Sequence, residues 1–129
     1  MNRLLVAFVL AGGLVAAGWT QSALAAEPSK IVDTAIGPVL ADMDGRTLYI
    51  YEKDVNGQSY CTGACADNWP PYTATENDVA SGDWSTIMRE DGEKQWAYKG
   101  QPVYTWSQDE KSGDTTGDGK NNLWRAAKP

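Results

Sequence analysis

The chain has 129 residues, with 17 acidic side chains, 11 basic side chains, six tryptophans and no histidine. Its formal net charge of −6 argues against nucleic acid and anionic lipid surfaces as partners, because both attract basic proteins. The absence of histidine excludes Ser-His-Asp and Cys-His catalysis and histidine-ligated haem, copper or zinc. Any general acid or base must therefore be a carboxylate, a lysine or a tyrosine.

The N-terminal segment 1–25 has the features of an export signal. Arg3 supplies the positive end, an apolar run broken only by glycines follows over 4–17, and small residues at 23 and 25 suit signal peptidase. The run is short for a membrane span, and no cysteine lies near the cut to carry a lipid anchor. We expect cleavage after Ala25 and no membrane insertion afterwards. The product is a periplasmic or secreted domain of 129 − 25 = 104 residues with charge 10 − 17 = −7.

The expected domain begins with short strands and turns. An apolar run at 39–41 precedes Asp44-Gly45, a tight turn into the β-forming stretch 47–51. Residues 64–68 can form one helical turn before Pro70-Pro71 stops it. The polar segment 75–84 joins this half to the next.

The second half repeats the pattern of strands and turns. Strands are expected at 84–88, 95–98 and 102–106, separated by Asp91-Gly92 and Lys99-Gly100. A polar loop at 112–122 and a short run at 123–126 end the chain. No stretch shows a sustained helical period.

An internal repeat relates the two halves. At a constant offset, 92 − 37 = 55 positions, several unusual residues coincide without a gap: Gly37 with Gly92, Gly45 with Gly100, Tyr49 with Tyr104, Asp54 with Asp109, and Trp69 with Trp124. We predict two units, about 30–74 and 85–129, within a single mostly β domain over 26–129. Because one unit cannot bury its own apolar face, the units should cover each other. The expected fold is a compact sandwich or barrel of about seven to eight short strands with an approximate two-fold axis.

Aromatic residues must form much of the core, since large aliphatic residues are few and phenylalanine is absent beyond the signal. The alternative is an aromatic platform for a sugar, quinone or porphyrin. Trp69 and Trp124 occupy the same place in both units, so we expect equivalent core anchors rather than ligand contacts.

Asp54 and Asp109 each follow a repeated tyrosine by five positions, at an expected strand end. A carboxylate there can accept backbone N–H bonds from the next turn. The alternative is a pair of catalytic carboxylates, as in glycoside hydrolysis.

The cysteine pair, Cys61 and Cys65, meets an oxidising compartment after export. A disulfide is the first interpretation, a redox pair the second, and half of a zinc site the third. In the loop 112–122, Asp114 and Asp118 fit early positions of a calcium loop, but Arg125 stands where a bidentate glutamate is needed. We therefore expect no metal and no cofactor, with Asp114 and Asp118 as the nearest approach to a metal site.

These residues resemble a bacterial family of secreted repeats of unknown function, whose hallmark is Tyr-x4-Asp. The motif occurs twice, as Tyr49 with Asp54 and as Tyr104 with Asp109, accompanied by Cys61-Thr-Gly-Ala-Cys65 and Trp69-Pro-Pro71. The missing lipid-anchor cysteine departs from the family's lipoproteins. The resemblance implies an exported location and a tandem architecture, and it implies no reaction.

Three hypotheses for function follow. The first is a non-enzymatic binding or structural module of the cell envelope, with an envelope protein or a small ligand as partner. The second is a redox or small-ligand accessory protein, handling haem or quinone for example. The third is a carboxylate-dependent hydrolase.

Overall fold

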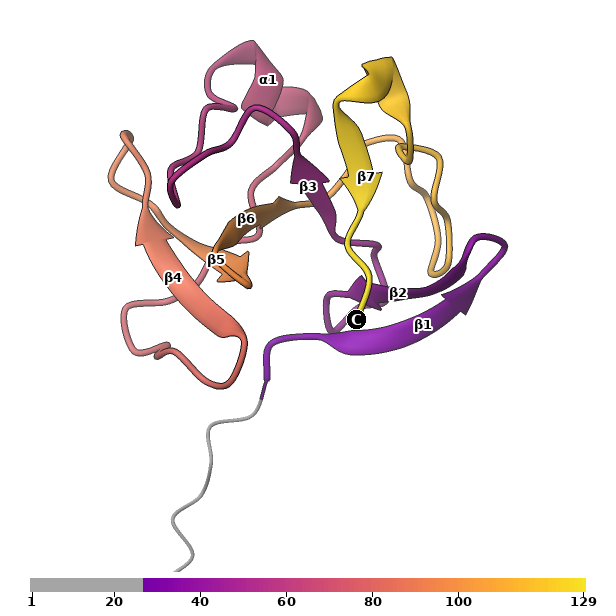
Figure 1. Cartoon of the computed structure of the whole chain (residues 1–129), viewed down its shortest axis with the longest axis horizontal. Coiled ribbons are helices and arrows are strands. Elements are labelled where there is room, and N and C mark those ends of the chain that lie inside the picture. The colour runs from indigo at the N-terminus through magenta and orange to yellow at the C-terminus, as the bar shows by residue number, and fades with distance from the viewer. Residues whose placement is uncertain (1–26) are drawn as a thin grey trace, which may run out of the picture.

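The computed structural model describes residues 27–129, and the predicted export signal lies outside them (Figure 1). The described part is mostly β, as predicted. Its elements are β1 (Lys30–Thr34), β2 (Gly37–Ala41), β3 (Tyr49–Tyr51), α1 (Ala64–Asn68), β4 (Trp84–Met88), β5 (Lys94–Tyr98), β6 (Gln101–Tyr104), η2 (Lys120–Asn122) and β7 (Trp124–Ala126). No helix of the described part is long and apolar enough to cross a membrane.

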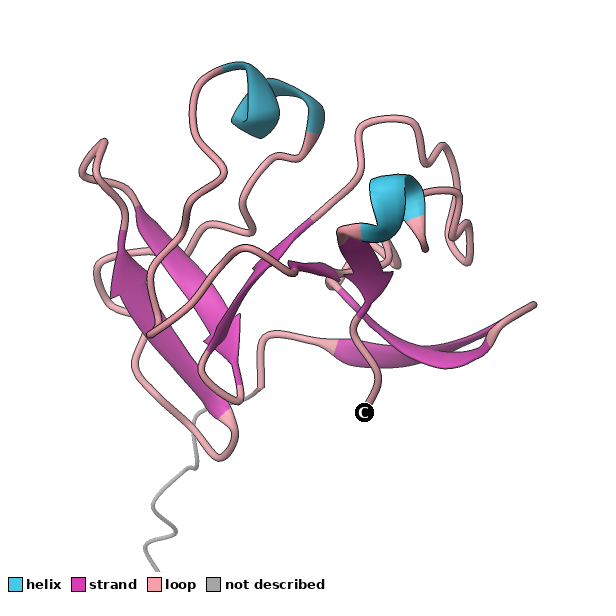
Figure 2. Cartoon of the chain, turned by 45° about the horizontal axis from the view of Figure 1, so that its top comes forward, coloured by secondary structure: helices cyan, strands magenta, loops and turns pink. Residues whose placement is uncertain are grey.

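The seven described strands form two sheets in a sandwich-like arrangement. β1 and β2 make an antiparallel hairpin, while the larger sheet has the order β4-β5-β6-β3-β7. The two short helices lie on one side of the larger sheet, away from the β1–β2 hairpin (Figures 1 and 2). β4 and β7 are the two edges of the larger sheet, so the barrel alternative is wrong and the sandwich alternative is confirmed.

An approximate two-fold axis runs between β3 and β6 of the larger sheet. Tyr49 of β3 pairs directly with Tyr104 of β6, its own equivalent in the repeat. Tyr49 also pairs with Ala126, and Tyr104 makes the matching bridge with Pro71. Each repeated tyrosine therefore lies between two segments of the other unit, so the two units are interleaved in the larger sheet.

The gap-free offset between the units is wrong for one strand of each unit. Lys30 pairs with Ala41, whereas Ser85, 55 positions after Lys30, pairs with Ala97, which lies 56 positions after Ala41. Before β5, the bonded pair Arg89 and Glu93 encloses three turn residues, whereas Thr34 and Gly37 enclose two before β2. After β5, Tyr98 and Gln101 enclose two turn residues, whereas Asp42 and Arg46 enclose three after β2. The coincidence of Gly37 with Gly92 therefore does not mark equivalent places in the ladder.

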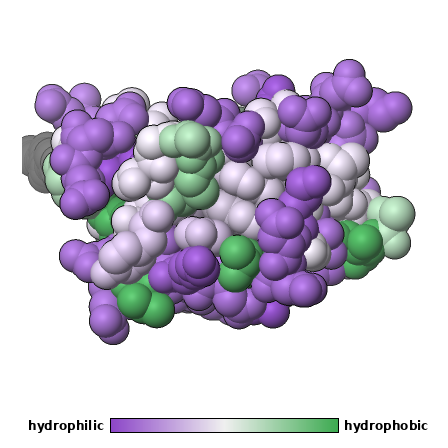
Figure 3. Space-filling view, turned by 90° about the horizontal axis from the view of Figure 1, so that it is seen from above, coloured by the Kyte–Doolittle hydropathy of each residue, from purple (hydrophilic) through white to green (hydrophobic). Residues whose placement is uncertain are grey.

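Two buried clusters make the core. One surrounds Tyr49, Tyr104 and three tryptophans, and the other surrounds Leu48, Trp84 and Val103. Most large core residues are aromatic, in line with the small aliphatic content. The surface seen in Figure 3 is mainly hydrophilic, with scattered apolar side chains, which fits the acidic composition.

β1 is not predicted by the sequence pattern, and β7 is predicted only as a short run at the end of the chain. The side chains of β1 are exposed or half-buried, and Ile31 is 60% exposed, so alternation of buried residues is weak. β1 is held instead by its backbone pairing with the buried β2.

Candidate functional site

The tyrosine and aspartate of the repeated Tyr-x4-Asp motif form hydrogen bonds across the two-fold axis. The Tyr49 hydroxyl donates to Asp109 Oδ2 at 2.7 Å, and the Tyr104 hydroxyl donates to Asp54 Oδ2 at 2.6 Å. Each tyrosine thus bonds the carboxylate of the other repeat. The four residues are recognisable as a motif in the sequence, but this exchange is not, because equal spacing within each unit suggests contacts within that unit.

Each carboxylate also holds the turn that follows its strand. Asp54 Oδ1 accepts the Tyr60 N–H at 2.7 Å, and Asp109 Oδ1 accepts both the N–H and the hydroxyl of Thr116 at 2.9 and 2.6 Å. Burial raises the pKa of the Asp54 carboxyl, although the hydrogen bonds from Tyr104 and Tyr60 act in the opposite direction.

Both repeated tyrosines have hydroxyls that resist ionisation. Burial raises the pKa of Tyr49 and of Tyr104 far above the usual value of 10, and the hydrogen bond to an aspartate raises each further. Both residues are 0% exposed. These phenols are therefore fixed as neutral donors at neutral pH.

Four aromatic rings form a stack that the two-fold axis divides. Trp69 and Trp124 lie parallel at its centre, with ring centroids 3.8 Å apart. Trp106 packs on Trp69 with its ring tilted by 30° and the centroids 4.1 Å apart, and Tyr51, its repeat equivalent, stacks on Trp124 at 4.2 Å. Gly117 lies against the stack so closely that a Cβ there would come 2.7 Å from the Trp69 ring.

Burial leaves these rings little access to solvent. Trp69 is 5% exposed, Trp124 is 3% exposed and Trp106 is 8% exposed. Lys120 covers the Trp106 ring, with its ammonium 5.3 Å from the ring centroid. A flat ligand would have to displace core residues to stack on the three tryptophans.

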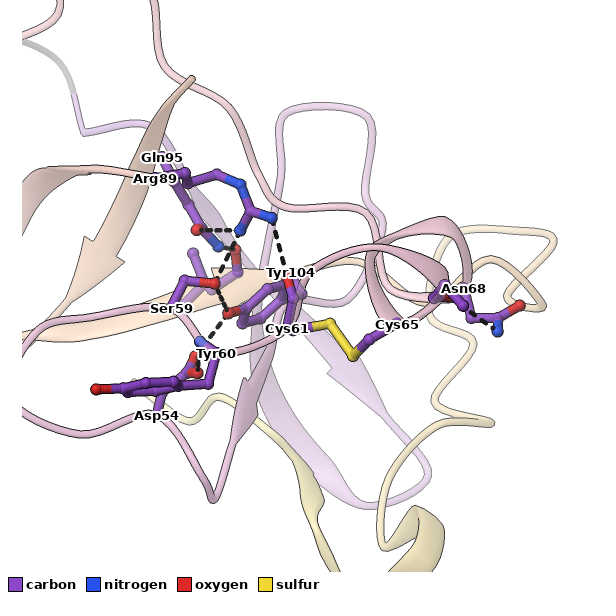
Figure 4. The surroundings of a disulfide bond; sticks show 11 residues. Asp54, Ser59, Tyr60, Cys61, Cys65, Asn68, Arg89, Gln95 and Tyr104 are labelled. Atoms are coloured by element: carbon purple, nitrogen blue, oxygen red, sulfur yellow. Dashed lines mark hydrogen bonds between the residues drawn. A yellow bond between two sulfur atoms is a disulfide. The ribbon is translucent and has the colours of Figure 1, made fainter. Parts of the chain in front are cut away.

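Cys61 and Cys65 form a disulfide that closes the loop before α1 (Figure 4). Cys61 is 0% exposed. Its carbonyl accepts a 2.9 Å hydrogen bond from Nη2 of Arg89, so the disulfide loop is fastened to the end of the β4–β5 hairpin.

Arg89 lies at the centre of a buried polar network. Its Nη1 donates to Ser59 Oγ at 2.8 Å and to Gln95 Oε1 at 2.9 Å, as the dashed lines in Figure 4 show. Gln95 in turn donates to the Val103 carbonyl at 2.8 Å. The Arg89 side chain is only 1% exposed, and its one close carboxylate among the described residues, Asp91, is exposed and 3.5 Å from Nε.

The network has a fixed direction. Arginine only donates and Tyr104 donates to Asp54, so Ser59 must accept from Arg89 and donate to the Tyr104 oxygen, 2.7 Å away. A chain of hydrogen bonds therefore runs from a buried cation, through two hydroxyls, to a buried carboxylate. Such chains strengthen each member by mutual polarisation.

Sequence reasoning missed Arg89, Ser59 and Gln95. Arg89 directly follows a strand and precedes a turn, where arginine is ordinarily exposed. Its place in the repeat is taken by Thr34, whose hydroxyl bonds only the local turn. No periodic signal could have identified the network, since it joins residues of both units and occurs at only one of the two Tyr–Asp sites.

A cleft of about 220 Å³ opens beside this network. One wall is the loop before α1 and the other is the end of β4 with the turn after it. The lining residues are Gln58, Ser59, Tyr60, Thr62, Met88, Arg89 and Glu90.

In the loop considered as a calcium site, the carboxylate oxygens already accept hydrogen bonds from backbone N–H groups. Asp114 Oδ2 accepts the N–H groups of Glu110 and Lys111, and Asp118 Oδ1 accepts that of Ala126. Within residues 27–129, no group of three or more histidine, cysteine, aspartate or glutamate side chains could hold a metal ion. Asp114 therefore holds its own turn, and Asp118 holds the strand β7 in this structure.

Residues 30–73 and 85–128 each match a family model described as a secreted repeat of unknown function. The two matches cover most of the chain, and the chain belongs to this family. The predicted tandem organisation is confirmed, with units close to the expected boundaries. No curated protein and no solved structure matched the chain.

Proposed function

We propose that this exported domain is a non-enzymatic binding module of the cell envelope, with the cleft beside Arg89 as its binding surface. One observation carries the proposal. The side chains present in both repeats are buried and bonded to one another, whereas the Arg89 network and its cleft occur once in the described part of the chain. A duplicated fold that forms without such a network at the Tyr49–Asp109 site does not require it at the Tyr104–Asp54 site.

The hydrolase alternative lacks an accessible acid or base at the repeated aspartates. Asp54 is 8% exposed and Asp109 is 3% exposed, and each is bonded by a tyrosine hydroxyl and a turn N–H. A catalytic carboxylate must come within hydrogen-bond reach of a substrate. The repeated aspartates are better suited to joining the two units.

The redox alternative is less well supported than a structural disulfide. Reactive cysteines are ordinarily accessible, while Cys61 is fully buried and its backbone carbonyl anchors Arg89. Thiol titration against a redox buffer separates the two. A strongly reducing potential supports the structural role, and an unusually oxidising one supports the redox role.

Native mass spectrometry of the protein released from its own periplasm tests the proposal directly. We expect a mature chain that begins at Ala26 and carries a non-covalent small ligand. Incubation with that ligand should return it unchanged. Conversion of the ligand to a product would contradict a non-enzymatic role, and a chain that retains Met1 would contradict the export signal.

A further inference from the structure

The cleft beside Arg89 is smaller than the pockets that hold drug-sized molecules. Its volume is about 220 Å³, against roughly 300–1,000 Å³ for such pockets. Its ligand should therefore be smaller than a drug-sized molecule.

Arg89 lines the cleft, and its side chain, which is only 1% exposed, places a buried positive charge beside it. Three of the four acceptors around Arg89 are neutral: the Ser59 hydroxyl, the Gln95 amide and the Cys61 carbonyl. The fourth, Asp91, is exposed to solvent at 3.5 Å and screens the charge weakly. These four hydrogen bonds account for four of the five N–H groups of the guanidinium, which leaves one Nη2 N–H for a further acceptor.

The rim of the cleft is apolar on both sides. Met88 is 68% exposed and Tyr60 is 52% exposed, so two of the large apolar side chains that face solvent lie at this one opening. Glu90 adds one negative charge to the lining. A ligand with a single negative charge meets the cation of Arg89, while a second negative charge on it would meet Glu90.

We propose that the cleft binds a small monocarboxylate that carries an apolar group. The inference rests on the proposed function, since it names the ligand class of the same surface. The carboxylate accepts from the remaining Nη2 N–H of Arg89, and the apolar group packs on Met88 and the Tyr60 ring. Charge-assisted hydrogen bonds of this kind are about twice as strong as neutral ones.

Titration of ¹⁵N-labelled exported protein with phenylacetate, and separately with its neutral amide, tests the ligand class. We expect phenylacetate to shift the backbone amides of 58–62 and 88–90. Phenylacetamide should bind about fivefold more weakly, because a charge-assisted hydrogen bond becomes a neutral one. Equal affinity for acid and amide, or shifts confined to the lysine-lined surface at Lys99 and Lys128, would overturn the inference.

Matched variants locate the site without disturbing the core. Met88→Ser should weaken phenylacetate binding, while Met43→Ser, at a methionine that is 61% exposed and outside the cleft, should leave it unchanged. Glu90→Gln should strengthen binding by removing a like charge, a gain that a purely structural role does not predict. Equal responses at the two methionines would place the ligand elsewhere.

Two results separate this inference from the proposed function. If folded protein binds neither probe, yet native mass spectrometry finds a retained ligand of another class, the carboxylate inference fails and the binding role stands. If phenylacetate binds as expected and is chemically altered, the ligand class holds and the non-enzymatic role fails.

Discussion

The two Tyr–Asp pairs are built alike and surrounded differently. Tyr49 with Asp109 is completed by the Thr116 hydroxyl and by the Gly117 N–H, which donates to the Tyr49 oxygen at 3.2 Å. Tyr104 with Asp54 is completed instead by Ser59, which links it to a buried Arg89. Among the described residues, the first pair has only neutral hydrogen-bond partners, and the chain from the second pair ends in a cation.

This difference separates what the fold needs from what has been added at one of the two Tyr–Asp sites. The exchange of tyrosine hydroxyls between repeats is common to both sites, and so are the stacked tryptophans. The arginine, the disulfide and the cleft occur on the Asp54 side. Variants that act equally on both sites therefore report on the fold, and variants that act on one report on the addition.

The largest effect should come from the central ring pair. Trp69→Ala and Trp124→Ala should each lower the free energy of unfolding by about 3–5 kcal/mol, the usual cost of truncating a buried aromatic residue. Because the rings are symmetry-related and similarly buried, the two losses should be similar. Urea unfolding followed by far-UV circular dichroism measures both. A variant that keeps its stability but loses a ligand would show that its ring is a binding group.

Alkaline pH should destabilise both sites together. The folded pKa values of Tyr49 and Tyr104 lie above the unfolded value of 10, and burial raises that of Tyr72 to about 12. Their contribution to stability is therefore complete below pH 10 and is lost above it, as the unfolded tyrosines ionise first. Each tyrosine contributes up to about 1.4 kcal/mol per pH unit. Urea unfolding at pH 9, 10 and 11 should show the decline, and a flat profile would contradict it.

Single hydroxyl deletions should distinguish the two sites. Tyr104→Phe breaks the chain from Arg89 to Asp54 and should cost about 1.5–3 kcal/mol, the range for hydrogen bonds to charged groups. Tyr49→Phe should cost less, because Asp109 keeps two bonds from Thr116 and the Tyr49 hydroxyl is not part of a chain that ends at a buried cation.

A double-mutant cycle checks that contrast. Arg89→Gln should couple to Tyr104→Phe and not to Tyr49→Phe, as measured by the free energy of unfolding. Equal coupling to both tyrosines would mean that the network around Arg89 also reaches the Tyr49–Asp109 site.

Removal of the disulfide should affect the Asp54 side alone. Replacing Cys61 and Cys65 by serine should cost about 2 kcal/mol from loop entropy, without abolishing folding. Backbone amide exchange should rise in the Cys61 loop and around Arg89, which the Cys61 carbonyl holds, and stay unchanged around Asp109. Complete unfolding would show that the disulfide has a larger role.

The smallest effect is expected at the surface. Arg125 bonds Glu52 at 2.8 Å, with both side chains largely exposed, and the repeat equivalents Pro70 and Ser107 cannot form an ion pair. Arg125→Ala should lower the free energy of unfolding by roughly 0.2–1 kcal/mol, and less at high salt. A larger loss, measured by the same urea unfolding, would show that this ion pair joins the units.

Much of the fold was predictable because a repeat constrains it twice. The matching positions at one constant offset predicted two β units and a shared core, and Trp84–Met88 was predicted as a strand over its full length. β1 was missed because its side chains are mostly exposed, and the one-residue exchange between turns was missed because it cancels in the total offset.

The sequence by itself determined the tandem β architecture, the cysteine pair and the aromatic character of the core, because each depends on residue type and spacing. The tertiary structure decided that each tyrosine serves the other repeat's aspartate, since only the pairing of Tyr49 with Tyr104 brings those groups together. It also decided that Arg89 is buried. An arginine at the end of a strand is exposed by default. Only the packing of the loop that carries Ser59 and Cys61 against Gln95 supplies the acceptors that allow the arginine charge to leave water.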